Sequence, residues 1–216
     1  MAQPTPATVS DEPTGPLGRL ARSARKHGVL GSLRVLATMA TIGLLLWFSR
    51  PTPLWAAVGT PIALFGEFWR MWASGHLLKS KELAISGPYR HVQNPLYFGR
   101  LCLLTGFAVM AYIPVSWQGR TLPLNLLVLA AMLAVFFGYY IPRKKRVEGQ
   151  RLAKLHGESY TRWASEVPLI IPSPRAWGEN VRRWSAERFH DNDEGWTVAI
   201  VLVVIAGFWV KALTAG

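Results

Sequence analysis

Side chains that could bind a polar ligand gather in one short stretch, residues 75–95, and just beyond it. The stretch is dense in turn-forming and ring side chains, namely Gly75, His76, Gly87, Pro88, Tyr89, His91, Asn94 and Pro95, with Tyr97 two residues later. Pro95 suits the first turn of a following helix, and Asn94 before it can cap that helix. The free N–H groups at such a helix start attract a carboxylate, which is one way to hold an amino-acid-like ligand.

A second stretch with chemical potential covers residues 143–194 and opens on the basic run Arg143–Arg146. This run either contacts anionic lipid headgroups or serves a binding site. Glu148 is the only acidic residue near the run. We therefore expect its carboxylate to accept hydrogen bonds from a ligand; an ion pair with Lys144 or Arg151 is the alternative.

The elements that must position these stretches are apolar runs. A helix rises about 1.5 Å per residue, so roughly 20 apolar residues span the hydrocarbon core of a bilayer. Runs near this length cover residues 29–48, 54–72, 96–115, 122–141 and 196–213, with proline and glycine in the breaks between them. We predict an all-α, polytopic membrane protein of about five transmembrane helices, which form one domain over residues 28–216.

The formal net charge of +12 would suit a nucleic-acid-binding protein, but its distribution suits a membrane protein. With the N-terminus in the cytoplasm, most of the 24 Lys and Arg residues fall on the cytoplasmic side, and only Arg50, Arg120 and Lys211 on the other. We expect a multi-pass protein of the cell's inner membrane, in contact with the lipid bilayer and without a nucleic-acid partner. Arg70, inside the second run, would snorkel or pair with Glu67.

Three further features of the sequence bear on its organisation and on the kinds of site it can form. Residues 1–27 are predicted to form a disordered cytoplasmic tail, because proline, threonine and glycine recur there without periodicity. Cys102 is the only cysteine and the five histidines are scattered, so we expect no disulfide and no metal site. Trp177, Val181 and Trp184 recur at helical spacing and predict an amphipathic helix in the membrane interface. Nothing in the sequence determines the oligomeric state.

The two polar stretches also resemble a known family. Residues 87–99 read Gly-Pro-Tyr-Arg-His-Val-Gln-Asn-Pro-Leu-Tyr-Phe-Gly, which is similar to the Gly-Pro-Tyr and His/Asn-Pro-x-Tyr-x-Gly signature of the isoprenylcysteine carboxyl methyltransferase family. These are small helical membrane enzymes related to phospholipid N-methyltransferases. Residues 146–172 resemble the family's second block through Arg146, Glu148, Leu152, Gly157, Tyr160, Val167, Pro168 and Pro172. The resemblance covers about half of the chain.

This resemblance implies a cytoplasm-facing pocket for S-adenosylmethionine and a lipophilic methyl acceptor that enters from the bilayer. It assigns Arg146 to acceptor binding and Glu148 to the first acid of a Glu-Glu pair, and we name these two as the catalytic candidates. The cofactor-binding candidates are Tyr89, His91, Asn94, Pro95, Tyr97 and Glu148. Ring faces such as those of Tyr89 and Tyr97 could contact adenine or the sulfonium.

The chain departs from the family pattern at two positions. Gln93 replaces the usual arginine, and Gly149 replaces the second acid, for which Gln150 is a possible substitute. Methyl transfer from a sulfonium requires positioning and water exclusion more than a strong acid or base, which agrees with the absence of a triad. The alternatives are a membrane reductase that uses a nicotinamide cofactor and a non-enzymatic membrane protein with a decayed site.

Overall fold

The computed structural model describes residues 40, 42–77, 82–192 and 194–214. Contacts divide the chain into two units, residues 1–47 and residues 48–216. In the first unit, residues 42–47 are helical. The predicted tail over residues 1–27 and most of the predicted first span, residues 29–48, lie outside the described residues.

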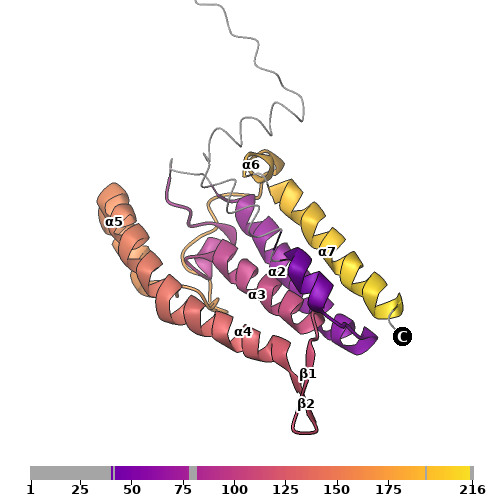
Figure 1. The fold of residues 1–216 in the computed structure, drawn as a ribbon. Coiled ribbons are helices and arrows are strands. Elements are labelled where there is room, and N and C mark those ends of the chain that lie inside the picture. The colour runs from indigo at the N-terminus through magenta and orange to yellow at the C-terminus, as the bar shows by residue number, and fades with distance from the viewer. Residues whose placement is uncertain (1–39, 41, 78–81, 193, 215–216) are drawn as a thin grey trace, which may run out of the picture. The chain divides into compact units, whose positions relative to one another are not determined.

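Helix α2 (Pro53–Ser74) is the centre of the second unit, packing against α3 (Pro95–Met110) and α7 (Glu194–Thr214), while α4 (Leu124–Val135) packs against α3 (Figure 1). Glycines allow α2 and α3 to touch backbone to backbone. A Cβ added to Gly66 would lie 2.6 Å from the carbonyl oxygen of Gly99, and one added to Gly106 would lie 2.6 Å from the backbone nitrogen of Ala63. The sequence analysis did not identify this small-residue interface.

Gly106→Ala should destabilise the protein by about 1–3 kcal/mol, because backbone atoms of α2 occupy the space that the new methyl group needs. The matched control is Gly138→Ala, since a Cβ there meets no atom within 4 Å. We expect the control to be neutral or slightly stabilising, because alanine favours helix more than glycine does. The measurement is unfolding in mixed micelles titrated with dodecyl sulfate, followed by circular dichroism. Equal behaviour of the two variants would refute the close helix contact.

Arg70 is buried and paired rather than snorkelling. Its guanidinium lies 2.5 Å from a carboxylate oxygen of Glu194 on α7 and 3.5 Å from one of Glu67, three residues earlier on α2. All three residues are buried. The predicted pairing with Glu67 is therefore present, and Glu194, which the sequence analysis did not consider, joins it and links α2 to the start of α7.

A short β-hairpin follows α3, and this corrects the predicted bounds of the third and fourth runs. Strands β1 (Pro114–Trp117) and β2 (Arg120–Pro123) pair antiparallel, with Pro114 opposite Pro123. Gln118 and Gly119 form the loop with φ of 48° and 76°, as a tight hairpin turn requires. Helical structure thus stops at Met110 and resumes at Leu124, not at residues 115 and 122.

Helical structure continues from Leu124 to Glu166, with a kink at Gly157. A π-helical turn η2 (Phe136–Tyr140) joins α4 to α5 (Ile141–Glu166). Pro142 has no N–H for the carbonyl of Gly138 and its ring crowds that carbonyl, which explains the wider turn. Further along, Gly157 kinks α5 with φ 54° and ψ −128°, a conformation open only to glycine.

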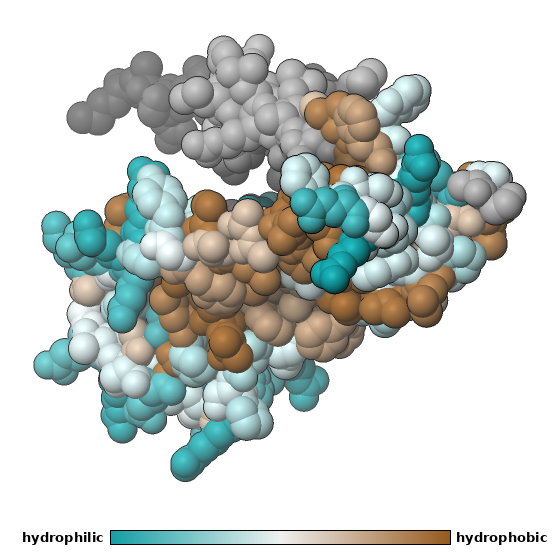
Figure 2. All heavy atoms as spheres, turned by 60° about the horizontal axis from the view of Figure 1, so that its bottom comes forward, coloured by the Kyte–Doolittle hydropathy of each residue, from teal (hydrophilic) through white to brown (hydrophobic). Residues whose placement is uncertain are grey.

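The chain is mostly helical, as predicted. Among the described residues, the continuous helix over residues 124–166 and α7 are long and apolar enough to cross a membrane, whereas α3 is apolar but has 16 residues. Leu127, Val203 and Val210 of these helices are more than half exposed. Figure 2 shows apolar side chains gathered across the middle of one face.

The predicted amphipathic helix over Trp177, Val181 and Trp184 is wrong. Residues 167–185 are irregular, and only α6 (Ala186–Asp191) after them is helical. Backbone N–H groups of this segment bond to other parts of the chain: Ser173 to the carbonyl of His91, Trp177 to that of Arg90 and Ser185 to that of Gly75. These tertiary hydrogen bonds satisfy the groups that a helix would otherwise pair.

Candidate functional site

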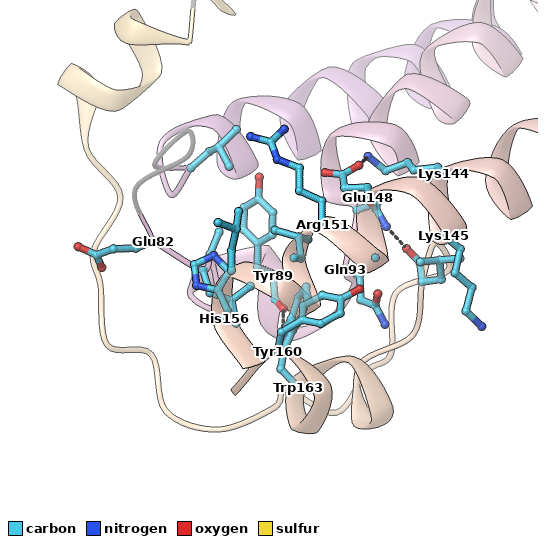
Figure 3. Close-up of a pocket in the computed structure, with 18 residues that line it drawn as sticks. Glu82, Tyr89, Gln93, Lys144, Lys145, Glu148, Arg151, His156, Tyr160 and Trp163 are labelled. Atoms are coloured by element: carbon cyan, nitrogen blue, oxygen red, sulfur yellow. Dashed lines mark hydrogen bonds and ion pairs between the residues drawn. The ribbon is translucent and has the colours of Figure 1, made fainter. Parts of the chain in front are cut away.

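A cavity of about 280 Å³ lies between α5 and the segment that joins α2 to α3 (Figure 3). Helix α5 supplies one wall because Glu148, Leu152, Leu155 and His156 fall on one helix face, at intervals of four, seven and eight residues. The joining segment supplies Glu82, Leu83, Ala84, Tyr89, Gln93 and Asn94. Both polar stretches singled out in the sequence therefore meet at this cavity.

The kink at Gly157 allows the end of α5 to close the cavity. Beyond it, Tyr160 and Trp163 line the wall, and the Trp163 indole donates a hydrogen bond of 3.0 Å to the carbonyl of Tyr89. Trp163 and Tyr89 are buried together with Ala73 and Val167 in one apolar cluster. Tyr89 itself belongs to η1 (Gly87–Arg90), a single 3₁₀ turn.

Gln93 and Asn94 attach the joining segment to the end of α5. The Gln93 amide donates to the carbonyls of Ala164 at 3.0 Å and Val167 at 2.6 Å, while the Asn94 amide donates to Leu169 at 3.0 Å. Asn94 occupies the N-cap position of α3, but its side chain makes no capping hydrogen bond, contrary to expectation. Pro95 begins that helix as predicted. Gln93 thus ties the joining segment to the end of α5.

Glu148 carries the charge at one end of the cavity. Its carboxylate forms an ion pair with Lys144, one turn earlier on the same helix, and the Lys144 ammonium lies 3.9 Å from the centre of the Tyr97 ring. The Lys144 side chain is 11 % exposed and that of Glu148 is 48 % exposed. The alternative of an ion pair with Lys144 is therefore realised, and about half of the Glu148 side chain remains exposed.

Several predicted site residues lie outside this cavity wall. The ring of Tyr97 faces Lys144, Pro95 is buried, and a ring nitrogen of His91 lies 2.8 Å from the carbonyl oxygen of Ser173. Arg146 and Gln150 are exposed on α5 and do not line the cavity. Of the predicted candidates, the structure brings together Tyr89, Asn94 and Glu148, and the roles assigned to all of them stay predictions.

The cavity wall also contains side chains to which the sequence analysis gave no site role. They are Arg151, His156, Tyr160 and Trp163. Lys144 and Lys145, from the basic run for which a binding site was one of two alternatives, also line it. The helical spacing from Glu148 would have found Arg151 and His156, since both lie within two turns of it on the same side. Gly149 also lines the cavity, and a Cβ added there would lie 3.2 Å from the Tyr160 hydroxyl. That hydroxyl therefore lies next to the backbone of Gly149.

Burial raises the pKa of both cavity tyrosines, whose phenols are neutral at physiological pH. It raises the pKa of the Tyr89 phenol above its usual range, with smaller contributions from the charges of Glu194 and Glu148. Burial, and after it the Glu148 carboxylate, also raises the pKa of Tyr160. Two phenol hydroxyls that stay neutral at physiological pH are available as hydrogen-bond donors to a ligand.

The cavity therefore combines an accessible carboxylate, fixed cations, neutral phenols and leucine walls. Comparison with protein-family models, with curated proteins and with solved structures finds no match for this chain.

Proposed function

We propose that this chain is an integral membrane methyltransferase that transfers a methyl group from S-adenosylmethionine to a lipophilic acceptor. The observation that carries the proposal is the meeting of the two family-like stretches at one cavity, with Glu148 and Asn94 in facing segments of its wall. Asn94 and Glu148 are more than 50 residues apart in the sequence, so only the tertiary structure brings them to one cavity. Nearby apolar helices suit an acceptor that arrives from lipid.

The side chains present fit the groups of the cofactor. Glu148 has accessible carboxylate surface to accept hydrogen bonds from ribose hydroxyls. Lys145 and Arg151 are cations that can bind the cofactor's carboxylate. Leu152, Leu155 and Leu169 offer apolar surface to adenine. Bound there, S-adenosylmethionine would supply an activated methyl group on a sulfonium, and the chain's part is to orient the reactants and exclude water.

A nicotinamide-dependent reductase is the second candidate, favoured by the three cations Lys144, Lys145 and Arg151 in the wall. Phosphate groups attract such side chains. One observation weighs against it, because Lys144 is already paired with Glu148.

The test is calorimetric titration of the purified full chain in lipid nanodiscs with S-adenosylhomocysteine, and separately with reduced nicotinamide dinucleotide phosphate. We expect S-adenosylhomocysteine to bind with micromolar affinity and the dinucleotide to give no heat of binding. Binding of the dinucleotide alone would replace the methyltransferase with the reductase. Binding of neither would leave the non-enzymatic alternative.

The proposed arrangement has five spans with the cavity on the cytoplasmic side, and its topology is directly testable. The charge distribution predicts that a reporter fused after Gly216 lies on the non-cytoplasmic side. A reporter inserted after Ser185, in the irregular segment beside the cavity, should lie in the cytoplasm. Paired alkaline phosphatase and fluorescent-protein fusions measure both positions. The opposite result at both sites would reject the orientation.

A further inference from the structure

His156 is a titratable side chain of the cavity wall to which the proposed function gives no role so far. It lies two turns along α5 from Glu148, which is roughly 12 Å along the helix axis. Figure 3 shows Glu148 and Lys144 on one side of the view and His156, with Glu82, on the other. The imidazole is half-buried, and among the described residues it makes no hydrogen bond and no ion pair.

The other titratable groups that face the cavity are poor proton acceptors. Tyr89 and Tyr160 are phenols that are neutral at physiological pH, and burial raises the pKa of both. Lys144, Lys145 and Arg151 carry only donors when charged.

The two carboxylates of the wall are already ion-paired. Glu148 pairs with Lys144, and Glu82 pairs with Arg182 of the irregular segment. Protonation of either carboxylate would weaken its pair. The His156 imidazole is thus the group of this wall whose ring nitrogens have no hydrogen-bond or ion-pair partner among the described residues.

The surroundings of His156 suit the head of a lipid-like molecule. Leu83, Ala84 and Leu155 line the cavity with it, so an apolar chain has surface to contact near the imidazole. A carboxylate acceptor would be ionised at neutral pH and would need no base. An amine or thiol must lose a proton when it is methylated, and a positioned imidazole can accept that proton.

We propose that His156 takes up the proton of the methyl acceptor, and that the acceptor is an N–H or S–H group on a lipophilic molecule rather than a carboxylate. This inference rests on the proposed function. The acceptor's lone pair forms a bond to the methyl carbon and displaces the electron pair of the former carbon–sulfur bond onto sulfur. His156 accepts the acceptor's proton on a ring nitrogen and then returns it to water.

The first test does not depend on turnover. The full chain in nanodiscs, with ¹³C-labelled histidine rings, is observed by NMR, and the His156 signal is the one lost in His156→Gln. We expect S-adenosylhomocysteine to shift this signal and to leave that of His190, an exposed histidine on α6, unchanged. A His156 signal that does not respond to the bound cofactor product would place His156 outside the occupied site and overturn the inference.

The second test compares three methyl acceptors. Phosphatidylethanolamine presents an amine N–H, dodecanethiol presents an S–H, and N-acetylfarnesylcysteine presents a carboxylate. We expect transfer to one of the first two, with a rate that falls as pH falls below neutral. His156→Gln and His156→Phe should each lower that rate by roughly a hundredfold and remove this pH dependence, with S-adenosylhomocysteine affinity unchanged. The control His190→Gln should match the wild type.

Transfer to the carboxylate alone, or wild-type rates and pH profiles in both His156 variants, would overturn this inference and leave the proposed function intact. If wild-type chain fails to bind S-adenosylhomocysteine, the proposed function itself fails, and this inference with it.

Discussion

Glu148→Gln should weaken the binding of S-adenosylhomocysteine by roughly 1.5–3 kcal/mol, or about ten- to a hundredfold. The carboxylate lines the cavity with half of its side chain accessible, and hydrogen bonds to a charged acceptor are stronger than those to a neutral amide. Folding should change little, because the Glu148 side chain is half exposed and glutamine keeps an oxygen that can accept a hydrogen bond from Lys144. Calorimetric titration measures the affinity, and circular dichroism monitors folding.

Two further variants separate ligand binding by Glu148 from its pairing with Lys144. Glu158→Gln makes the same charge change at an exposed position of α5 outside the cavity wall and should leave affinity unchanged. Lys144→Met removes the ion-pair partner but keeps the carboxylate, so it should weaken binding less than Glu148→Gln. Equal losses in Lys144→Met and Glu148→Gln would mean that Glu148 serves only to hold Lys144 in place.

Trp163→Ala should lower the free energy of unfolding by about 3–5 kcal/mol. The indole is 3 % exposed, packs against Ala73, Tyr89 and Val167, and donates a hydrogen bond to the Tyr89 carbonyl. Its removal leaves a void between α5 and the joining segment, so the cavity should also lose affinity for S-adenosylhomocysteine. Unfolding with dodecyl sulfate in mixed micelles, followed by circular dichroism, measures the change.

Trp163→Phe should lower the free energy of unfolding much less than Trp163→Ala, because it keeps an aromatic ring in the apolar cluster. The loss of the indole hydrogen bond should contribute about 1 kcal/mol of that smaller change. The matched surface control is Trp196→Ala on α7, where the side chain is 64 % exposed and the expected change is within about 0.5 kcal/mol. A Trp163→Ala variant as stable as Trp196→Ala would show that the end of α5 does not close the cavity.

The positions of α2 and α7 could be predicted from the sequence, and so could Pro95 as the start of α3. Both depend on local physics: hydropathy over about 20 residues and the missing N–H of proline. The predicted runs 54–72 and 196–213 agree within two residues with α2 and α7. Glu148 and Asn94 were selected by residue type, and the structure places both in the cavity wall.

Contacts between distant residues decided what local rules could not. The irregular segment of residues 167–185 reads as an amphipathic helix, yet its N–H groups bond to the carbonyls of Gly75, Arg90 and His91. The Gly157 kink brings Trp163 to Tyr89 across more than 70 residues of sequence. His156 faces the cavity because it lies about two helical turns from Glu148 on the same face of α5. Only the tertiary structure shows that its ring nitrogens have no hydrogen-bond partner among the described residues. Local sequence determines which backbone conformations are accessible, whereas tertiary hydrogen bonds and packing determine which of them is adopted and what each side chain meets.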